Sequence, residues 1–394
     1  MSKPNLLIAF GGISPEHEVS VITAIQAASA IGKERYNLIP LYISKNGRML
    51  TGEKLLDLEF YKDLKKAEAE ADPCAFQTDE NGQTVLTNLK GKGWFSKPEQ
   101  HHINTVLVAF HGGDGENGSF QGLCESYNLP YTGSNPMASS VGMDKRAAKI
   151  FAGSIGIPVV GDVFVTESEW IADKASLVAD VEKLKYPVFV KPVHLGSSIG
   201  VQKASDREAL EVAVETAFRF DDQLIVEKAV SPLLEVNCSV IGDADRARPS
   251  VCEQPLTQAE LLSFEDKYMG DDGKGMASAT RIIPAPIGDE LTKKIQQDSV
   301  KLFRSLNGSG VARLDFLINK ETNEYFFNEI NTIPGSFSFY LWEKTELPFP
   351  ALIQELIDIA QKRHQTKNGR VRSYETNLLS SKAAKGIKGL KGKG

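Results

Sequence analysis

GVARLDFLINKETNEYFFNEINTIPG, residues 310–335, consists of two apolar runs on either side of the polar stretch Asn319–Asn323. This pattern predicts an antiparallel hairpin. Side chains alternate between the two faces of a strand, and the turn residue Thr322 lies midway in sequence between Asp315 and Glu329. The hairpin therefore brings these two carboxylates nearly opposite each other on one side of the sheet.

Two facing carboxylates repel each other unless a cation lies between them. Arg313 and Asn331 share the face of Asp315 and Glu329. Oxygen ligands at one point suit Mg²⁺, which proteins commonly hold by one or two carboxylates plus substrate phosphates. A surface salt-bridge cluster with Arg313 explains the carboxylates equally well. The turn Asn331–Gly335 favours a binding site, since its backbone amides can face an anion.

A second candidate site lies in YPVFVKPVHLGSSIGVQ, residues 186–202. A strand ends near Lys191 and is followed by the loop Gly196–Gly200, which contains Ser197 and Ser198. Small residues let backbone amides approach a phosphate closely, and Lys191 offers a compact positive charge. A flexible hairpin loop accounts for these residues by themselves. Together with a Mg²⁺-type cluster, nucleotide binding is the better explanation.

Strands and helices alternate in the first part of the chain, which predicts an open, Rossmann-like parallel α/β sheet. The predicted strands are Leu6–Phe10, Leu38–Ile43 and Val106–Phe110. Ser14 is a candidate N-cap for a helix that continues to Ile31, and Glu53–Glu70 is charge-rich and predicted helical, with a polar connection after it. Glycines follow the first and third strands. Ligands of such sheets bind beyond the carboxyl ends of strands.

The later part of the chain predicts two further regions, so the fold class is α/β and α+β, multidomain. The predicted strands are Pro158–Val165, Val188–Val193, Leu224–Glu227, Val236–Gly242 and Val311–Ile318. The predicted helices are Met143–Gly153, Asp206–Phe220, Asp289–Leu306 and Phe349–Gln361. We expect an N-terminal domain over residues 1–133, a central region over 134–233, a C-terminal region over 234–365, and a disordered Lys/Gly-rich tail over 366–394.

Composition excludes several classes of protein. The net charge of −6 over 394 residues gives no indication of nucleic-acid binding. The cysteines Cys74, Cys124, Cys238 and Cys252 are far apart, so reduced thiols are expected rather than a disulfide framework or a zinc site. The short apolar start is typical of a strand rather than a signal peptide, and no apolar run reaches the about 20 residues of a membrane helix. A cytoplasmic protein with no membrane partner is expected.

Eight segments resemble, in order, the motifs of the D-alanine–D-alanine ligase family. They are GGISPEHEVS (11–20), HGGDGENGSFQG (111–122), YTGS (131–134), MDK (143–145), KPVHLGSSIGV (191–201), DKY (266–268), RLD (313–315) and NEINTIPG (328–335). Asn117 stands where the family usually has Asp. Any one motif is modest, but the eight together span Leu6 to about Trp342 and are highly specific.

The resemblance implies an ATP-grasp fold in two parts after the first domain, with ATP held between them. It assigns nucleotide contacts to Lys145, Lys191, Ser198, Glu227, Lys228, Ala229, Glu235 and Lys267. In this set Lys145, Lys191 and Lys267 contact phosphates, residues 227–229 contact the adenine end, and Glu235 binds the ribose. It assigns two Mg²⁺ ions, or Mn²⁺ in their place, to Asp315, Glu329 and Asn331.

The same resemblance implies the substrate contacts. Glu16 binds the ammonium of the first D-alanine and joins Ser197 and Tyr268 in a hydrogen-bonded triad. Arg313 and the Gly335 amide stabilise the oxyanion of the tetrahedral intermediate. His111, Tyr340 and Leu341 complete the substrate set. Lys149 is interpreted as a surface charge, and Gly270–Gly275 as the flexible part of a closing loop.

The implied activity is synthesis of D-alanyl-D-alanine for peptidoglycan through an acyl phosphate, by a homodimer. Two departures from the family leave the second substrate open. Tyr340 replaces a serine that helps bind the second substrate's carboxylate, and Leu262–Phe264 replaces a Tyr-Asp-Tyr run. One alternative is therefore a ligase that joins D-alanine to a hydroxy acid or another amino acid. A nucleotide-binding homologue without catalysis is less favoured.

Overall fold

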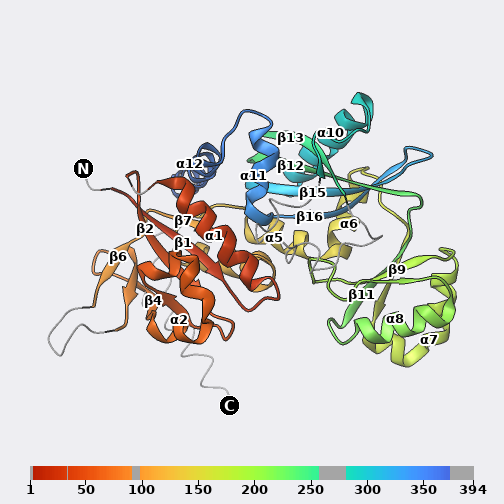
Figure 1. The fold of residues 1–394 in the computed structure, drawn as a ribbon, viewed down its shortest axis with the longest axis horizontal. Helices are drawn as coiled ribbons and strands as arrows, with labels where there is room; N and C mark the ends of the chain where they lie inside the picture. The colour runs from red at the N-terminus through yellow and green to blue at the C-terminus, as the bar shows by residue number, and fades with distance from the viewer. Residues whose placement is uncertain (1–2, 33, 91–97, 257–280, 373–394) are drawn as a thin grey trace, which may run out of the picture.

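The computed structural model describes residues 3–32, 34–90, 98–256 and 281–372, and these form three sheets with their helices (Figure 1). Lys267, Tyr268 and the loop Gly270–Gly275 lie outside the described residues, as do Leu262–Phe264 and residues 373–394 of the tail. Within the described part, no helix is long and apolar enough to cross a membrane.

The N-terminal sheet has seven strands in the order β6-β5-β4-β3-β2-β1-β7. Their bounds are β1 Asn5–Gly11, β2 Asn37–Ile43, β3 Met49–Thr51, β4 Asp72–Thr78, β5 Thr84–Asn88, β6 Gln100–His102 and β7 Thr105–Val108. The predicted parallel sheet is confirmed for β2-β1-β7. The predicted polar connection was wrong, because it contains the antiparallel strands β4, β5 and β6. Strand β4 has few apolar residues, β5 has two and β6 has none, so the sequence shows no clear strand pattern there.

The helices of this part differ from the prediction at two places. Their bounds are α1 His17–Ile31, η1 Glu53–Leu56, η2 Leu58–Lys62, α2 Leu64–Glu70, α3 Gly113–Glu116 and α4 Ser119–Ser126. The charge-rich stretch is thus broken into two 3₁₀ turns and a short helix. The prediction of Ser14 as the N-cap was wrong, because α1 begins only at His17 and its N-cap is Glu16. The Ser14 hydroxyl still accepts from the Glu16 amide at 3.0 Å and donates to the His111 carbonyl at 2.7 Å.

The second sheet has four antiparallel strands in the order β10-β9-β11-β8. The bounds are β8 Asp162–Thr166, β9 Val188–Pro192, β10 Gln202–Ala204, β11 Gln223–Lys228, α7 Glu167–Glu182 and α8 Arg207–Ala217. Helices α7 and α8 lie together on the outer side of the sheet (Figure 1), and their apolar residues form one core with it.

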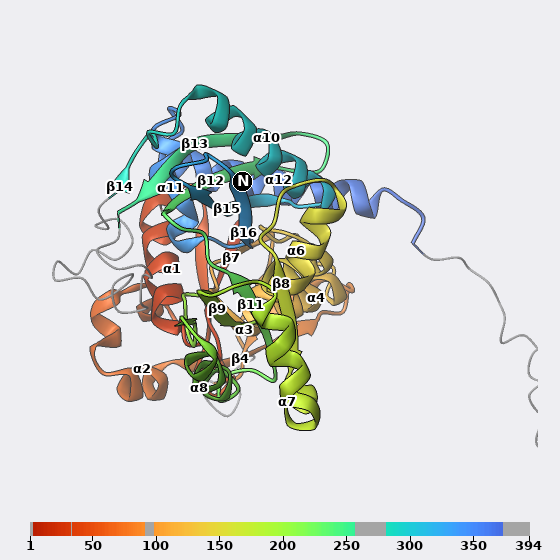
Figure 2. The same cartoon turned by 90° about the vertical axis from the view of Figure 1, so that its right-hand side faces the viewer.

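The third sheet has five strands in the order β14-β13-β12-β15-β16. The bounds are β12 Leu233–Gly242, β13 Ala247–Pro255, β14 Arg281–Ile282, β15 Gly310–Asn319, β16 Tyr325–Asn331, α5 Pro136–Met143, α6 Lys145–Ser154 and α10 Asp289–Ser305. The predicted hairpin is confirmed, because Asp315 pairs with Glu329 and Arg313 with Asn331. Helices α5, α6 and α10 pack on this sheet, which lies above the four-stranded one in Figure 2.

The chain then returns to its first sheet. The bounds are η4 Gly335–Ser338, α11 Phe339–Glu343 and α12 Phe349–Asn368. Leu352 and Leu356 of α12 share the core of Leu6 on β1. Arg363 donates to the carbonyls of Gly133 and Tyr131 at 2.6 and 2.9 Å. The division at residues 133, 233 and 365 stays a proposal.

Candidate functional site

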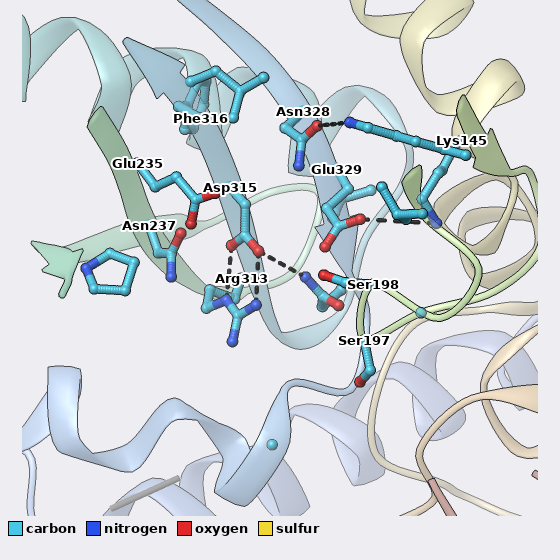
Figure 3. A pocket seen from close by; sticks show the side chains of 18 of the residues that line it. Lys145, Ser197, Ser198, Glu235, Asn237, Arg313, Asp315, Phe316, Asn328 and Glu329 are labelled. Atoms are coloured by element: carbon cyan, nitrogen blue, oxygen red, sulfur yellow. Dashed lines mark hydrogen bonds and ion pairs between the residues drawn. The ribbon is translucent and has the colours of Figure 1, made fainter. Parts of the chain in front are cut away.

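One cleft between the three sheets gathers most of the predicted site residues (Figure 3). Its lining includes Glu16, His111, Lys145, Lys191, Ser197, Ser198, Glu227, Lys228, Glu235, Arg313, Asp315, Glu329, Asn331, Gly335 and Tyr340. Ala229 and Leu341 are not part of this lining, and Leu341 is fully buried. Any role of these two residues through their backbone stays a prediction.

The hydrogen-bonding register of the third sheet builds the polar floor of the cleft. Glu253 on β13 pairs with Asn237 on β12, which pairs with Asp315 on β15, which pairs with Glu329 on β16. Paired residues of antiparallel strands present their side chains on the same face. A line of polar groups therefore crosses four strands, and the hairpin prediction identified only the Asp315–Glu329 half of it.

Arg313 and Lys145 supply positive charge to this line (Figure 3). The Arg313 Nε and Nη2 atoms each donate to Asp315 at 2.7 Å, and Asn331 donates to Asp315 at 3.4 Å. The Lys145 ammonium lies 3.9 Å from Glu329. Burial opposes the charge of Arg313, but Asp315 outweighs it and holds the pKa of the guanidinium well above its usual value. Arg313 therefore stays charged at every physiological pH.

The set of oxygen donors in the cleft fits a divalent cation whose remaining ligands come from a substrate. Asp315, Glu329 and Asn331 offer carboxylate and amide oxygens at one edge of the hairpin. Within the described ranges no group of three or more His, Cys, Asp or Glu residues forms a metal cluster. Two carboxylates suit Mg²⁺, which commonly takes its remaining ligands from phosphates and water.

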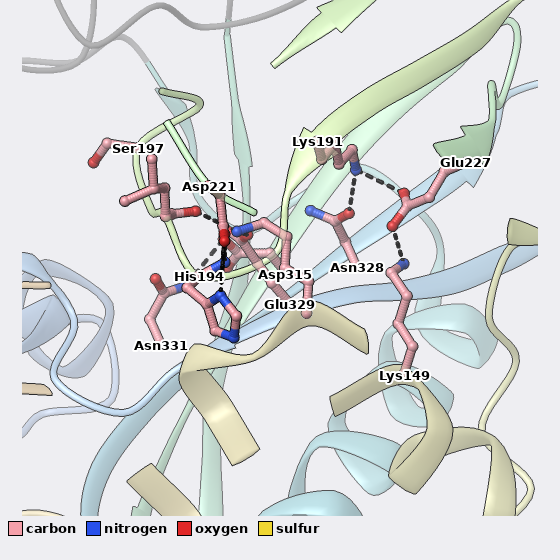
Figure 4. A network of polar contacts seen from close by, with 12 residues as sticks. Lys149, Lys191, His194, Ser197, Asp221, Glu227, Asp315, Asn328, Glu329 and Asn331 are labelled. Atoms are coloured by element: carbon pink, nitrogen blue, oxygen red, sulfur yellow. Dashed lines mark hydrogen bonds and ion pairs between the residues drawn. The ribbon is translucent and has the colours of Figure 1, made fainter. Parts of the chain in front are cut away.

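A buried network of charges lies at the other side of the cleft (Figure 4). Glu227 is 1% exposed, and its carboxylate lies 3.0 Å from the Lys149 ammonium and 2.7 Å from that of Lys191. Lys191 also donates to the Asn328 side chain at 3.1 Å. Burial opposes the charge of Glu227, yet the two ammonium groups lower its pKa to about 2. The carboxylate is thus an anion between two cations.

The interpretation of Lys149 as a surface charge was wrong. Its side chain is 3% exposed and donates to the Phe327 carbonyl at 3.4 Å, in addition to the Glu227 ion pair. A lysine on an amphipathic helix is usually solvated, and only the packing of α6 against β16 shows otherwise. The spacing of four residues from Lys145, which puts both lysines on one face of α6, was the available signal.

The Glu16 corner joins the first domain to the Gly-Ser loop. The Ser197 hydroxyl donates to the Glu16 carboxylate. Gly112 has φ +64°, and a Cβ atom there would lie 2.7 Å from Glu16 Oε2, while a Cβ at Gly196 would lie 3.0 Å from the same atom. Glycine at both positions lets the two loops close around the carboxylate.

His111 and Glu116 lie buried behind this corner. Burial lowers the pKa of His111 to about 4, so the imidazole is neutral, and the ring lies 2.8 Å from the Thr23 hydroxyl. Burial and the Glu16 charge raise the pKa of Glu116 to about 7, against the amides of Gly112 and Ile333 that donate to it at 2.9 and 3.0 Å. Glu116 thus connects the loop that contains Gly112 to the turn after β16.

Glu116 makes folding stability depend on pH. The pKa of Glu116 in the folded protein, about 7, lies above the ordinary 4.5. The protonated carboxyl therefore adds its full contribution to the free energy of unfolding below pH 4.5, and this contribution is lost as the pH rises through 7. We expect Glu116→Gln to lose this dependence, so that its stability relative to wild type improves by up to about 3 kcal/mol across that window. Thermal midpoints of both proteins across the window measure it, with Glu80→Gln, at an exposed turn, as control. A constant offset between Glu116→Gln and wild type would contradict the assignment.

The turn after β16 carries strained backbone. Ser336, Phe337 and Ser338 have φ of 49°, 55° and 51°, which residues other than glycine rarely adopt. The Ser336 amide donates to Thr23 at 3.2 Å and its hydroxyl to Gln26 at 2.7 Å, both on α1. Such strain persists where the surroundings fix the conformation, and it clusters at ligand sites. It holds Gly335 at the edge of the cleft.

The motifs of the sequence missed five polar residues of the cleft. The cleft is also lined by Asn237, Glu253, Arg281, Asn328 and Glu116, none of which was singled out. Asn328 and Glu116 lie inside two of the quoted motifs, so a closer reading of those motifs offered a signal. No sequence signal marks Glu253 or Arg281, because strand pairing brings them to the site.

Family models match both halves of the chain. Residues 5–134 match the model described as D-ala D-ala ligase N-terminus, and residues 151–358 match D-ala D-ala ligase C-terminus. The D-alanine–D-alanine ligase of Thermosipho africanus is 37% identical over 382 residues, which cover 97% of this chain and 100% of that protein. The enzyme of that name from Bacillus cytotoxicus is 35% identical over 375 residues, 93% of this chain and 98% of that protein.

Solved structures show the same architecture. The D-alanine–D-alanine ligase of Coxiella burnetii superposes with a TM-score of 0.78 at 28% identity, over 96% of this chain and 100% of that one. VanG D-Ala:D-Ser ligase from Enterococcus faecalis gives 0.75 at 27% identity, over 91% and 100%.

Proposed function

The chain belongs to the D-alanine–D-alanine ligase family, and we propose that the cleft residues carry out its reaction in the roles given below. It is an ATP-dependent ligase that joins two D-alanine molecules for peptidoglycan synthesis. The ATP-grasp architecture of its neighbours agrees with the two sheets that flank the cleft. The alternative acceptors considered above are not favoured by the relatives.

The nucleotide lies along the Lys145–Lys191–Glu227 side of the cleft. Lys145 and Lys191 bind phosphate oxygens, and Ser198 contributes from the Gly-Ser loop. Glu227 and Lys228 face the adenine, and Glu235 the ribose. Support comes from their common lining of one cleft and from the fixed negative charge of Glu227, which can accept from an exocyclic amine.

The first D-alanine lies between Glu16 and Arg313. Glu16, oriented by Ser197, binds the ammonium group of this D-alanine. The carboxylate oxygen of the same D-alanine then attacks the terminal phosphorus of ATP, and ADP is released. The amine of the second D-alanine then forms a C–N bond to the acyl carbon, and the C–O bond to phosphate breaks. Arg313 and the Gly335 amide stabilise the intermediate oxyanion, and the departing proton passes to phosphate or water.

Mg²⁺ would be held by Asp315, Glu329 and Asn331, where it offsets phosphate charge. The count of two ions and the use of Mn²⁺ are part of this proposal. The small-molecule substrates point to work in the cytoplasm, where ATP is available. A homodimer without nucleic-acid or membrane partners is proposed from the family resemblance alone.

The observation that carries the assignment is the convergence of the Glu16–Ser197 pair, the Lys145–Lys191 pair and the Asp315–Glu329 pair on one cleft. ADP release with ATP, Mg²⁺ and D-alanine tests it, with L-alanine as control and products identified by mass. We expect D-alanine-dependent turnover and the dipeptide. ADP release without dipeptide, or no release at all, would refute the assigned reaction.

Lys149 is expected to support nucleotide binding through Glu227. Lys149→Met leaves Glu227 with Lys191 as its remaining cation, so Lys191 is held back from the phosphates. We expect an about 10-fold loss of ATP affinity and about 3 kcal/mol of stability, measured by calorimetry and thermal unfolding. Lys183→Met removes an exposed ion pair with Asp180 and is the control, with an expected change within about 0.5 kcal/mol. Unchanged ATP affinity in Lys149→Met would rule out this role.

A further inference from the structure

Three side chains form a charged and aromatic cluster beside the oxyanion residues. The Tyr340 hydroxyl donates to Glu253 Oε1 at 2.7 Å, and the Arg281 Nη1 atom donates to Glu253 Oε2 at 3.1 Å. The Arg281 guanidinium carbon lies 3.8 Å from the centre of the Tyr340 ring. Asn237 adds a fourth contact, donating to Glu253 at 3.2 Å.

The cluster lies at the acceptor end of the cleft. Glu253, Arg281 and Tyr340 line the same cleft as Arg313 and Gly335. The negative charge of Glu253 helps to raise the pKa of Arg313, which places the cluster near that guanidinium. The first D-alanine is assigned to the Glu16–Ser197 pair and the nucleotide to the Lys145–Lys191 pair, and we assign the cluster near Arg313 to the second substrate.

Tyr340 does not bind the acceptor carboxylate in the way proposed for the serine that the family carries at this position. Its hydroxyl is engaged by Glu253 at 2.7 Å, and burial raises the pKa of Tyr340 beyond its usual value, so the phenol stays a neutral donor. The ring stacks on Arg281 instead. Tyr340 thus orients an arginine.

Resting on the proposed function, we propose that Arg281 binds the carboxylate of the acceptor D-alanine, with Glu253 and Tyr340 as positioning residues. A guanidinium carries its N–H donors in one plane, and this fork matches the geometry of a carboxylate. The buried Glu253 holds one edge of the Arg281 guanidinium, and the Tyr340 ring holds its plane. The always-charged arginine takes over the anion recognition that a neutral hydroxyl supplies elsewhere in the family.

Acceptors with and without a carboxylate test the proposal. We expect Arg281→Met to raise the KM for D-alanine as acceptor by about 10- to 100-fold, as for loss of a charge-assisted hydrogen bond, with kcat less affected. D-alaninamide, which lacks the carboxylate, and hydroxylamine, which traps the acyl phosphate, should be used equally by wild type and variant. ATP affinity should stay unchanged.

Matched variants separate positioning from structure. Arg281→Lys keeps the charge without the fork and should show an intermediate KM. Glu253→Gln and Tyr340→Phe should raise the D-alanine KM less than Arg281→Met and leave D-alaninamide unaffected. Arg248→Met is the control, because Arg248 also pairs with a carboxylate, Glu355, and faces an aromatic ring, Trp342, but lies outside the cleft lining.

The outcomes are distinct. If Arg281→Met weakens D-alanine and D-alaninamide alike, or weakens ATP binding, Arg281 does not recognise the acceptor carboxylate. If Arg281→Met does not fold, the ratio between the two acceptors in Arg281→Lys decides in the same way. If wild type with D-alanine releases no ADP, the proposed function fails first and this inference fails with it.

Discussion

Arg313→Ala is expected to lower kcat by about 100- to 1,000-fold, the cost of removing one donor to an oxyanion. The guanidinium is held in place by two 2.7 Å bonds to Asp315 and is partly buried in the cleft that Gly335 also lines. It therefore needs no reorganisation when charge develops on the acyl oxygen, so its contribution falls on the transition state rather than on ATP binding. The KM for ATP should change little.

One further variant and a chemical rescue distinguish this loss of activity from a loss of folding. Arg313→Lys keeps the charge but cannot pair bidentately with Asp315, so it should recover only part of the activity. Added guanidinium should partly rescue Arg313→Ala, which a misfolded chain would not allow. Steady-state kinetics with ATP-binding calorimetry makes the measurement, and an equal loss of ATP affinity and of kcat would contradict an oxyanion role.

Asp315→Asn is expected to lower turnover at least about 100-fold at fixed Mg²⁺, because several kcal/mol of charge stabilisation is lost and 1.36 kcal/mol is tenfold in rate. The Mg²⁺ concentration that gives half-maximal activity should rise as well. Glu329→Gln should behave similarly, since Glu329 is the cross-strand partner of Asp315. A chelator should abolish wild-type activity, and excess Mg²⁺ should restore it.

Glu321→Gln is the matched control for these variants. It removes one carboxylate from the same hairpin at its exposed turn, so its turnover and Mg²⁺ dependence should equal those of wild type. Titration of activity with Mg²⁺ compares the three variants. A slow Asp315→Asn enzyme with an unchanged Mg²⁺ midpoint would assign Asp315 to holding Arg313 rather than to the metal.

The β15–β16 hairpin was predictable because its determinants are local. Alternation along each strand and a polar turn fix which residues face each other. The pairing of Asp315 with Glu329 therefore followed from the sequence and is confirmed. The parallel strands β1, β2 and β7 were predictable for the same reason, since each is a short apolar run.

The misses have one cause, which is burial that no local pattern encodes. Lys149 is an ordinary helix lysine until α6 packs on β16 and encloses it beside Glu227. Strand β4 buries Cys74 and Phe76 among polar neighbours, and β5 has only two apolar residues among its five although four of them are buried, so their sequence resembles a connection.

The sequence by itself determined the fold class, the carboxylate hairpin and, through the order of its motifs, the family and the ATP-dependent reaction. These depend on spacing along the chain, which the sequence states directly. Only the tertiary structure decided that Lys149 and Lys191 share Glu227, and that Arg281, Glu253 and Tyr340 meet beside Arg313. Those contacts join strands and helices far apart in sequence, and their free energy appears only when packing excludes water around them.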